Sequence, residues 1–231
     1  MCGRFTLRAR AEDVAEHFEL DATPELQPRF NIAPGQDVAV VRSAEGAQRT
    51  LERRIWGLVP SWARDPAIGH RMINARSETV AEKPAFRGAF AGRRCLIPAD
   101  GFYEWAVGST PKQPYWIARA DEGLFAFAGL FEEWHAEASD AIHSCSIVTT
   151  AANGTLAPIH HRMPVILGPE DYATWLGDDA DRANERSALM RPCPDDWLRA
   201  RPVGLRVNSP RHDGPECLAP APMQPVQGSL L

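Results

Sequence analysis

The chain has 231 residues, of which 44% are hydrophobic and 24% are charged. Its formal net charge is -5 and its pI is about 5.8. A chain of this length suits one domain with a substantial buried core. A protein that binds nucleic acid non-specifically is normally basic overall, so the charge excludes that class and leaves room only for a local positive cleft on an acidic body.

Five cysteines are scattered along the chain: Cys2, Cys95, Cys145, Cys193 and Cys217. Their odd number and the lack of any C-x-x-C pair argue against a disulfide framework and against a structural zinc site. The N-terminal stretch lacks the apolar segment of a signal peptide, and no run is long enough to cross a membrane. We therefore expect a cytoplasmic protein with no metal, no cofactor and no membrane partner.

Apolar spacing predicts a short amphipathic helix over residues 11–20, in which Val14 and Phe18 share a face. Residues 21–29 are predicted to be a loop and residues 30–35 a turn. Apolar and alternating runs predict strands over residues 37–42, 49–58, 95–98, 115–119, 124–131, 144–150, 165–167 and 203–207. Polar loops are expected at residues 43–48 and 136–142.

The C-terminal part is predicted to contain more helix. Pro169 and two acidic residues begin a helix that ends at Gly177. A more polar helix is predicted over residues 180–190 and a short one over residues 195–200. No linker or repeat divides the chain, so we expect one domain over residues 1–219 and a flexible tail over residues 220–231.

The first five residues, Met1-Cys2-Gly3-Arg4-Phe5, form the most informative segment. If Met1 is removed, the α-amine and the thiol of Cys2 lie on adjacent carbons. The amine can condense with an aldehyde, and the thiol can then close the imine into a thiazolidine ring. The alternative is that Cys2 is inert, as a lone cysteine near a chain end usually is.

Two further segments place polar residues next to apolar ones. Asn74 follows two apolar residues, where it either closes a turn or orients a reacting group, and Arg76 can hold a phosphate through its fork of donors. In the run 102–105, alternation places Glu104 on the same face as Phe102. A carboxyl among large aromatic side chains would have a raised pKa, which suits a general acid; otherwise Glu104 lies on a solvated face.

The adjacent His160 and His161 are expected to face different ways, so that only one can serve a site. The alternatives are a surface pair or one satisfied core imidazole. Arg162 is placed to grip a phosphate if His160 acts on a substrate. Of two tryptophans in an irregular segment, Trp56 is predicted to pack in the core, and Trp62 either packs there or offers a stacking surface for a base.

These residues lie in motifs that closely resemble those of the SOS-response-associated peptidase (SRAP) family, the abasic-site processing proteins. The motifs occur in family order and are Met1-Cys2-Gly3-Arg4-Phe5, Asn31-Ile32-Ala33-Pro34, Trp56-Gly57-Leu58-Val59-Pro60, Asn74-Ala75-Arg76-Ser77-Glu78-Thr79, Asp100-Gly101-Phe102-Tyr103-Glu104-Trp105 and Ile159-His160-His161-Arg162-Met163-Pro164. They extend from Met1 to about Gly214. The resemblance makes His160, and not His161, the equivalent of the family histidine.

The resemblance implies an α+β fold, with curved, barrel-like antiparallel sheets and short helices outside. It also implies that single-stranded DNA containing an abasic site is bound, and that the α-amine of Cys2 attacks the ring-opened sugar aldehyde. Closure by the thiol gives a thiazolidine that shields the site from strand cleavage. In this mechanism Glu104 donates protons, His160 assists proton transfer, and Asn74 orients the amine and the sugar.

The same resemblance implies which residues contact DNA. The backbone contacts are Arg4, Arg76, Thr149 and Arg162, and the residues that pack against bases or sugars are Pro34, Trp62 and Trp105. Family members can have a second tryptophan after the position of Trp62, where this chain has Ala63, so we expect a weaker wedge at strand junctions. We expect a monomer that acts at the nucleoid or the replication fork, and its thiol can also serve as an autopeptidase that removes Met1.

Three other functions fit some of these residues. Class II glutamine amidotransferases also begin Met-Cys-Gly and use the thiol on an amide, although Arg4 stands where they usually have an apolar residue. A cysteine peptidase would hydrolyse peptides through Cys2 in the absence of DNA. A non-catalytic reader of modified DNA would bind reversibly, and its binding would survive Cys2→Ala.

Overall fold

The computed structural model describes residues 2–43, 48–108, 110–136 and 140–222, and its strands form two sheets. The first sheet has five strands, which pair antiparallel in the order β13, β8, β7, β1 and β2. Their bounds are Leu198–Pro202 for β13, Pro114–Arg119 for β8, Gly101–Trp105 for β7, Phe5–Leu7 for β1 and Arg29–Ile32 for β2.

The second sheet closes into a barrel. It runs from β11 through β10, β4, β3, β6 and β9 to β12, and β9 also pairs with β10, so the five central strands form a ring to which β5 is attached. The bounds are β3 Asp37–Ser43, β4 Arg49–Trp56, β5 Asn74–Arg76, β6 Arg94–Ala99, β9 Phe125–Trp134, β10 Ile142–Ala151, β11 Arg162–Pro164 and β12 Ile166–Leu167. The expected barrel-like α+β fold is confirmed. The sheet is not wholly antiparallel, because β10 runs parallel to β4 and β5.

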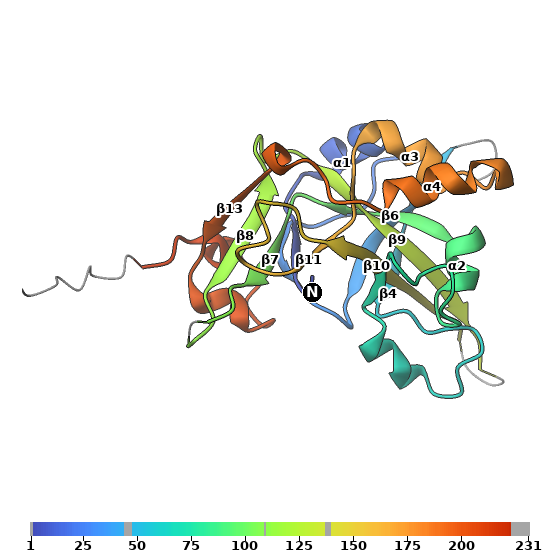
Figure 1. Cartoon of the computed structure of the whole chain (residues 1–231), viewed down its shortest axis with the longest axis horizontal. Coiled ribbons are helices and arrows are strands. Elements are labelled where there is room, and N and C mark those ends of the chain that lie inside the picture. The colour runs from blue at the N-terminus through green and yellow to red at the C-terminus, as the bar shows by residue number, and fades with distance from the viewer. Residues whose placement is uncertain (1, 44–47, 109, 137–139, 223–231) are drawn as a thin grey trace, which may run out of the picture.

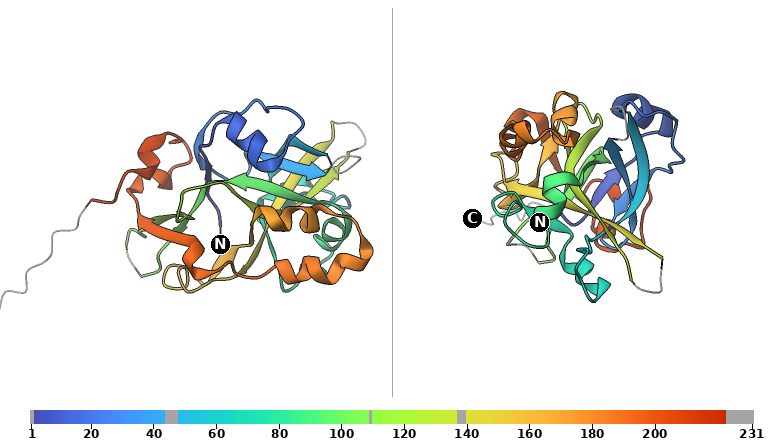
Figure 2. Two further views of the ribbon diagram at one scale, coloured as in Figure 1. Left: turned by 90° about the horizontal axis from the view of Figure 1, so that it is seen from above. Right: turned by 90° about the vertical axis from the view of Figure 1, so that its right-hand side faces the viewer.

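Short helices flank the sheets (Figures 1 and 2). They are α1 (Ala11–Phe18), α2 (Arg87–Gly92), α3 (Pro169–Leu176) and α4 (Ala183–Leu189), with 3-10 turns at Pro66–Arg71, Ala180–Arg182, Asp195–Trp197, Leu205–Asn208 and Pro215–Leu218. The predictions for α1 and α3 are confirmed: α1 buries Val14 and Phe18, and α3 begins at Pro169 and ends before Gly177. α3 and α4 follow each other along one flank of the molecule (Figure 2).

The strand β1 is anchored where the two sheets meet. Phe5 packs edge-on against Trp56 of β4 and Phe127 of β9, with ring centroids 5.2 and 5.6 Å apart. Trp56 is buried, as predicted. In Figure 1, β1 (dark blue, near the mark N) lies on the side of the five-stranded sheet that faces the barrel. Because both sheets hold Phe5, the residues just before it have a fixed place at the seam.

Two buried polar residues of the sequence motifs hold the strands around this seam. Asp100 accepts hydrogen bonds from Thr6 Oγ1 at 2.6 Å and from two backbone N–H groups that follow β1. Asn31 on β2 donates from Nδ2 to the carbonyls of Ser209 and His212, at 3.0 and 2.7 Å. Buried polar groups need such partners to avoid a desolvation cost. Asp100 and Asn31 therefore position the N-terminal strand.

The structure corrects three local predictions. The turn predicted at residues 30–35 begins only after residue 32, because residues 29–32 pair with β1 as strand β2. Residues 195–200 form one 3-10 turn and then enter β13, which pairs with β8. The predicted strand at 203–207 is an isolated bridge at Val203 followed by a 3-10 turn. In each case the presence or absence of a distant strand partner overrode the local pattern.

Other differences concern short or polar segments. The polar helix predicted over residues 180–190 is a 3-10 turn followed by α4, and neither α2 nor β5 was predicted, because both are very short. Residues 44–47, 137–139 and 223–231, which belong to the predicted loops at 43–48 and 136–142 and the predicted tail at 220–231, lie outside the described residues. The domain boundary at residue 219 therefore stays a prediction. Among the described helices, none is long and apolar enough to cross a membrane.

Candidate active site

Cys2 is buried at the seam between the two sheets. β1 is antiparallel to β7, and the Tyr103 N–H donates to the Arg4 carbonyl at 2.9 Å. Because the strands are antiparallel, residues before Arg4 lie beside residues after Tyr103. Cys2 therefore lies beside the C-terminal end of β7, where Glu104 is located. From the other sheet, Asn74 on β5 donates from Nδ2 to the Cys2 carbonyl at 2.9 Å. The two sheets thus bring together three residues that are far apart in the sequence.

Burial governs the charge of both ionisable side chains in this cluster. Glu104 is only 3% exposed, which excludes the solvated alternative, and burial raises its pKa above the ordinary glutamic acid value. Burial also raises the pKa of the Cys2 thiol, and the negative charge of Glu104 raises it further. The two groups are therefore close enough to interact. At neutral pH the thiol is protonated, and Glu104 retains a proton more readily than an exposed glutamate does.

The two histidines stack on each other, with ring centroids 4.4 Å apart and planes at 24°. The prediction that they face different ways is wrong, because residues 160–161 lie outside the strands, where neighbouring side chains would alternate. His160 Nδ1 contacts the Arg162 backbone in two ways: it lies 3.0 Å from the N–H and 3.2 Å from the carbonyl oxygen, so this nitrogen is held by the backbone and Nε2 is the ring nitrogen left to meet a ligand. Burial lowers the pKa of His160, so this ring is neutral at neutral pH. His161 partly offsets the effect of burial on the pKa of Glu104, so the stacked pair lies towards that carboxyl.

Arg162 is bound by its neighbours in the structure. Its guanidinium donates to both carboxylate oxygens of Glu78, and also to the Thr149 carbonyl at 2.6 Å and hydroxyl at 3.2 Å. Thr149 is fully buried, so its hydroxyl reaches Arg162 and not the surface. Glu78 lies in one of the sequence motifs, but no role was predicted for it. Its negative charge close to Arg76 in the sequence is the feature that could have indicated a role.

Two other arginines that are predicted to contact DNA differ in how far their guanidinium groups are already bound by protein atoms. Arg76 is exposed, and its side chain makes no hydrogen bond or ion pair within the described ranges. Its register opposite Thr149 places it at the edge of the barrel near the seam. Arg4 is half-buried and donates from Nη1 to Asn31 Oδ1 at 2.8 Å and to the Val207 carbonyl at 2.6 Å. Part of the Arg4 guanidinium therefore binds the C-terminal segment at Val207.

The three residues predicted to touch bases or sugars also differ in exposure. Trp62 is 57% exposed, which excludes the core alternative, and its indole N–H donates to the Pro84 carbonyl at 3.2 Å. Pro34 is exposed. Trp105 is half-buried, and its indole N–H donates to Asn208 Oδ1 at 2.7 Å. Both indole rings are therefore held in fixed orientations by their hydrogen bonds.

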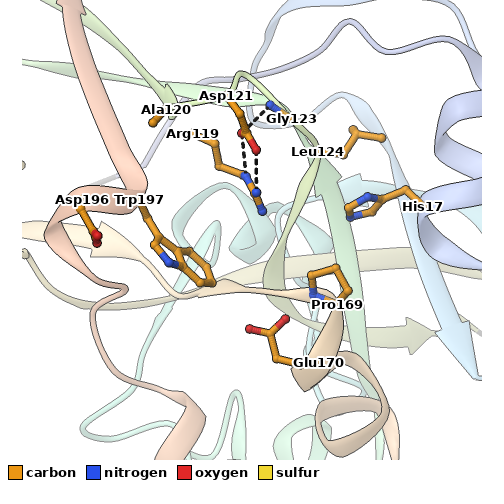
Figure 3. A pocket seen from close by; sticks show the side chains of 10 residues that line it. All are labelled: His17, Arg119, Ala120, Asp121, Gly123, Leu124, Pro169, Glu170, Asp196 and Trp197. Atoms are coloured by element: carbon orange, nitrogen blue, oxygen red, sulfur yellow. Dashed lines mark hydrogen bonds and ion pairs between the residues drawn. The ribbon is translucent and has the colours of Figure 1, made fainter.

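A cavity of about 610 Å³ lies at the other end of β8 from this cluster. Figure 3 shows Arg119 at its centre, bound through two hydrogen bonds to Asp121, with Trp197 on one side and His17 on the other. None of the predicted site residues lines this cavity. Within the described ranges, no group of three or more His, Cys, Asp or Glu side chains is placed to hold a metal ion.

The chain is thus an α+β protein in which a closed barrel is joined to a second sheet and Cys2 is buried at the seam beside a buried carboxyl. The chain belongs to the SRAP family: residues 1–210 match the family described as SOS response associated peptidase (SRAP).

Known proteins support this assignment. The chain is 40% identical over 222 residues to the abasic site processing protein YoqW of Bacillus subtilis, an alignment that covers 94% of this chain and 99% of that one. It is 32% identical over 235 residues to the abasic site processing protein HMCES of Xenopus tropicalis, covering 89% and 70%. A crystal structure of a Bacteroides thetaiotaomicron protein superposes with a TM-score of 0.82 at 25% identity, covering 95% of this chain and 100% of that chain.

Proposed function

We propose that this protein processes abasic sites in single-stranded DNA by forming a covalent thiazolidine at Cys2, once Met1 has been removed. The observation that carries the proposal is the arrangement at the seam, where Asn74 holds the Cys2 backbone and the buried Glu104 lies beside the thiol. The relatives named abasic site processing proteins support the choice of substrate.

The chemistry follows from the two nucleophiles of Cys2. Its free α-amine attacks C1′ of the ring-opened deoxyribose, and loss of one water gives an imine. The sulfur then adds to the imine carbon, and the thiol proton passes to the nitrogen. An α-amine has a pKa of about 8, so a useful fraction is neutral near neutral pH. The raised pKa of the thiol means that the amine attacks first and the sulfur closes the ring afterwards.

Three side chains assist these steps in the proposal. Glu104 protonates the sugar ring oxygen as the ring opens, regains a proton from the nitrogen that has attacked C1′, and then protonates the hydroxyl that leaves as water; burial keeps its pKa high enough to hold the proton. Asn74 fixes the Cys2 backbone, so that the amine approaches C1′ from one direction. His160, whose Nδ1 is held by the Arg162 backbone, hydrogen-bonds the sugar or the adjacent phosphate through Nε2.

The DNA path of the proposal uses the exposed residues around the seam. Arg76 contacts a backbone phosphate, and Trp62 offers a rigid stacking surface for a base. Pro34 and Trp105 contact the sugar or base on the other side of Cys2. Thr149 contributes through Arg162, whose guanidinium it holds.

The test is intact-mass spectrometry of the protein before and after it is mixed with a single-stranded oligonucleotide that contains one abasic site. The protein should lack the mass of Met1, and a heat-stable adduct should form with the mass of protein plus oligonucleotide less one water. Cys2→Ala should form no stable adduct, and Cys2→Ser, which keeps the amine, should form only an imine that heating or dilution reverses. Loss of Met1 without any adduct, together with hydrolysis of glutamine, would favour the amidohydrolase alternative instead.

A further inference from the structure

The ion pair between Arg162 and Glu78 occupies a guanidinium that DNA would otherwise reach. Arg162 Nη1 donates to Glu78 Oε1 at 2.5 Å, and Nη2 donates to Oε2 at 3.0 Å. This two-point geometry is the one in which a guanidinium also binds a phosphate. Glu78 therefore fills the position that a backbone phosphate would take.

Arg162 does not depend on Glu78 for its place in the structure. Its Nη2 also donates to the carbonyl and the hydroxyl of Thr149, which is buried in β10. The Arg162 side chain is 12% exposed, whereas the Glu78 side chain is 51% exposed. The carboxylate is thus the outer member of the pair, and it can move into solvent while the guanidinium stays anchored.

The charge of Glu78 opposes an approaching phosphate. Its hydrogen bond to Arg162 lowers its pKa, so the carboxylate is ionised at neutral pH. Arg76 lies two residues earlier, exposed and opposite Thr149 in the β5–β10 register. Because Glu78 is paired with Arg162, its negative charge opposes a phosphate that binds Arg76 and Arg162 together.

We infer that Glu78 is a specificity-determining residue, which competes with DNA phosphate for Arg162 and keeps the reversible affinity for intact single strands low. The inference rests on the proposed function, in which the DNA backbone passes Arg76 and Arg162. Retention of DNA then depends on the covalent step at Cys2, and undamaged strands dissociate.

The experiment measures equilibrium binding of a single-stranded oligonucleotide that contains a tetrahydrofuran in place of the abasic sugar and has no aldehyde. Glu78→Gln should bind about two- to fivefold more tightly than the parent protein, the size of an exposed charge pair. The slope of log K against log salt should become steeper by about 0.7, the change for one added phosphate contact on a single strand. Glu78→Asp, which keeps the charge, should bind like the parent protein.

Two further variants isolate the effect. Glu82→Gln removes the same charge from a nearby exposed residue that has no ion pair within the described ranges, and it should bind like the parent protein. In an Arg162→Gln background, Glu78→Gln should give no further gain. The inference is overturned if Glu78→Gln binds equally or more weakly, if Glu82→Gln gains as much, or if the gain persists without Arg162.

The outcome is separable from that of the proposed function. The binding assay contains no aldehyde, so it reads the competition at Arg162 and not the chemistry at Cys2. If the parent protein forms the covalent adduct and Glu78→Gln does not tighten binding, only the inference about Glu78 fails. If Glu78→Gln tightens binding but neither the variant nor the parent protein forms an adduct, the covalent mechanism fails. The inference that Glu78 competes with DNA phosphate for Arg162 then stands.

Discussion

At the scale of single residues, Glu104 carries the clearest conflict between stability and chemistry. It is buried at the seam, and burial raises its pKa. A carboxyl that is disfavoured in its ionised form makes the folded state less stable at neutral pH. The same property makes it a proton donor at a pH where ordinary glutamates are ionised.

Glu104→Gln separates these two effects. Adduct formation should slow by about 100-fold or more, the usual contribution of a general acid. The folded state of the variant should be more stable than that of the parent protein at neutral pH, because the variant has no buried carboxyl to ionise. In the parent protein the destabilisation begins as the pH rises through the unfolded-state pKa of about 4.3 and is complete above the raised folded-state pKa.

The thermal midpoints of Glu104→Gln and the parent protein should therefore differ little at about pH 4 and should favour the variant at about pH 8. Thermal unfolding at both pH values measures this difference. If the difference between the two midpoints is the same at both pH values, the pKa of Glu104 is not raised by folding.

At the scale of elements, Arg94 joins two helices to the barrel. It lies in β6, and its side chain is 1% exposed. Its guanidinium donates to four carbonyls and one carboxylate at the ends of α2 and α3, those of Phe90, Ala91, Trp175, Gly177 and Asp178. The last carbonyls of a helix lack partners within it, so one buried arginine completes the ends of two helices.

Arg94→Leu should lower the free energy of unfolding by about 3–5 kcal/mol, because it leaves buried carbonyls without donors and Asp178 without its cation. Denaturation in urea measures the loss. Arg87→Leu, at the exposed start of α2, is the matched control and should stay within about 0.5 kcal/mol of the parent protein. Equal losses in both variants would mean that Arg94 contributes no more than a surface arginine.

At the scale of the whole molecule, the fold buries every cysteine of the sequence. All five are free and buried. In a Cys2→Ala protein, the four remaining thiols should react with a thiol reagent only as fast as the protein unfolds, and all four should react in denaturant. A fast-reacting thiol in the folded variant would contradict their burial. With the other four thiols protected, any thiol that reacts in the folded parent protein but not in the Cys2→Ala variant is Cys2.

Much of this molecule could be predicted before the structure. Local apolar spacing predicts α1, α3 and most barrel strands, because these segments bury their apolar faces in the ordinary way. The β13 segment could not be predicted, because only its pairing with β8 keeps Leu198 and its successors extended. The stacked histidines were mispredicted for a similar reason: the alternation rule holds only inside a strand.

The sequence by itself determined the family and predicted Cys2 and the residues that accompany it as the site, because both depend on residue types in a fixed order. Only the tertiary structure decided which of them lie together. Closure of the barrel and the antiparallel pairing of β1 with β7 bring Asn74 and Glu104 to Cys2, and the turn after β5 brings Glu78 to Arg162. Burial, which sets the pKa of Glu104 and of the thiol, arises only when both sheets pack around the seam.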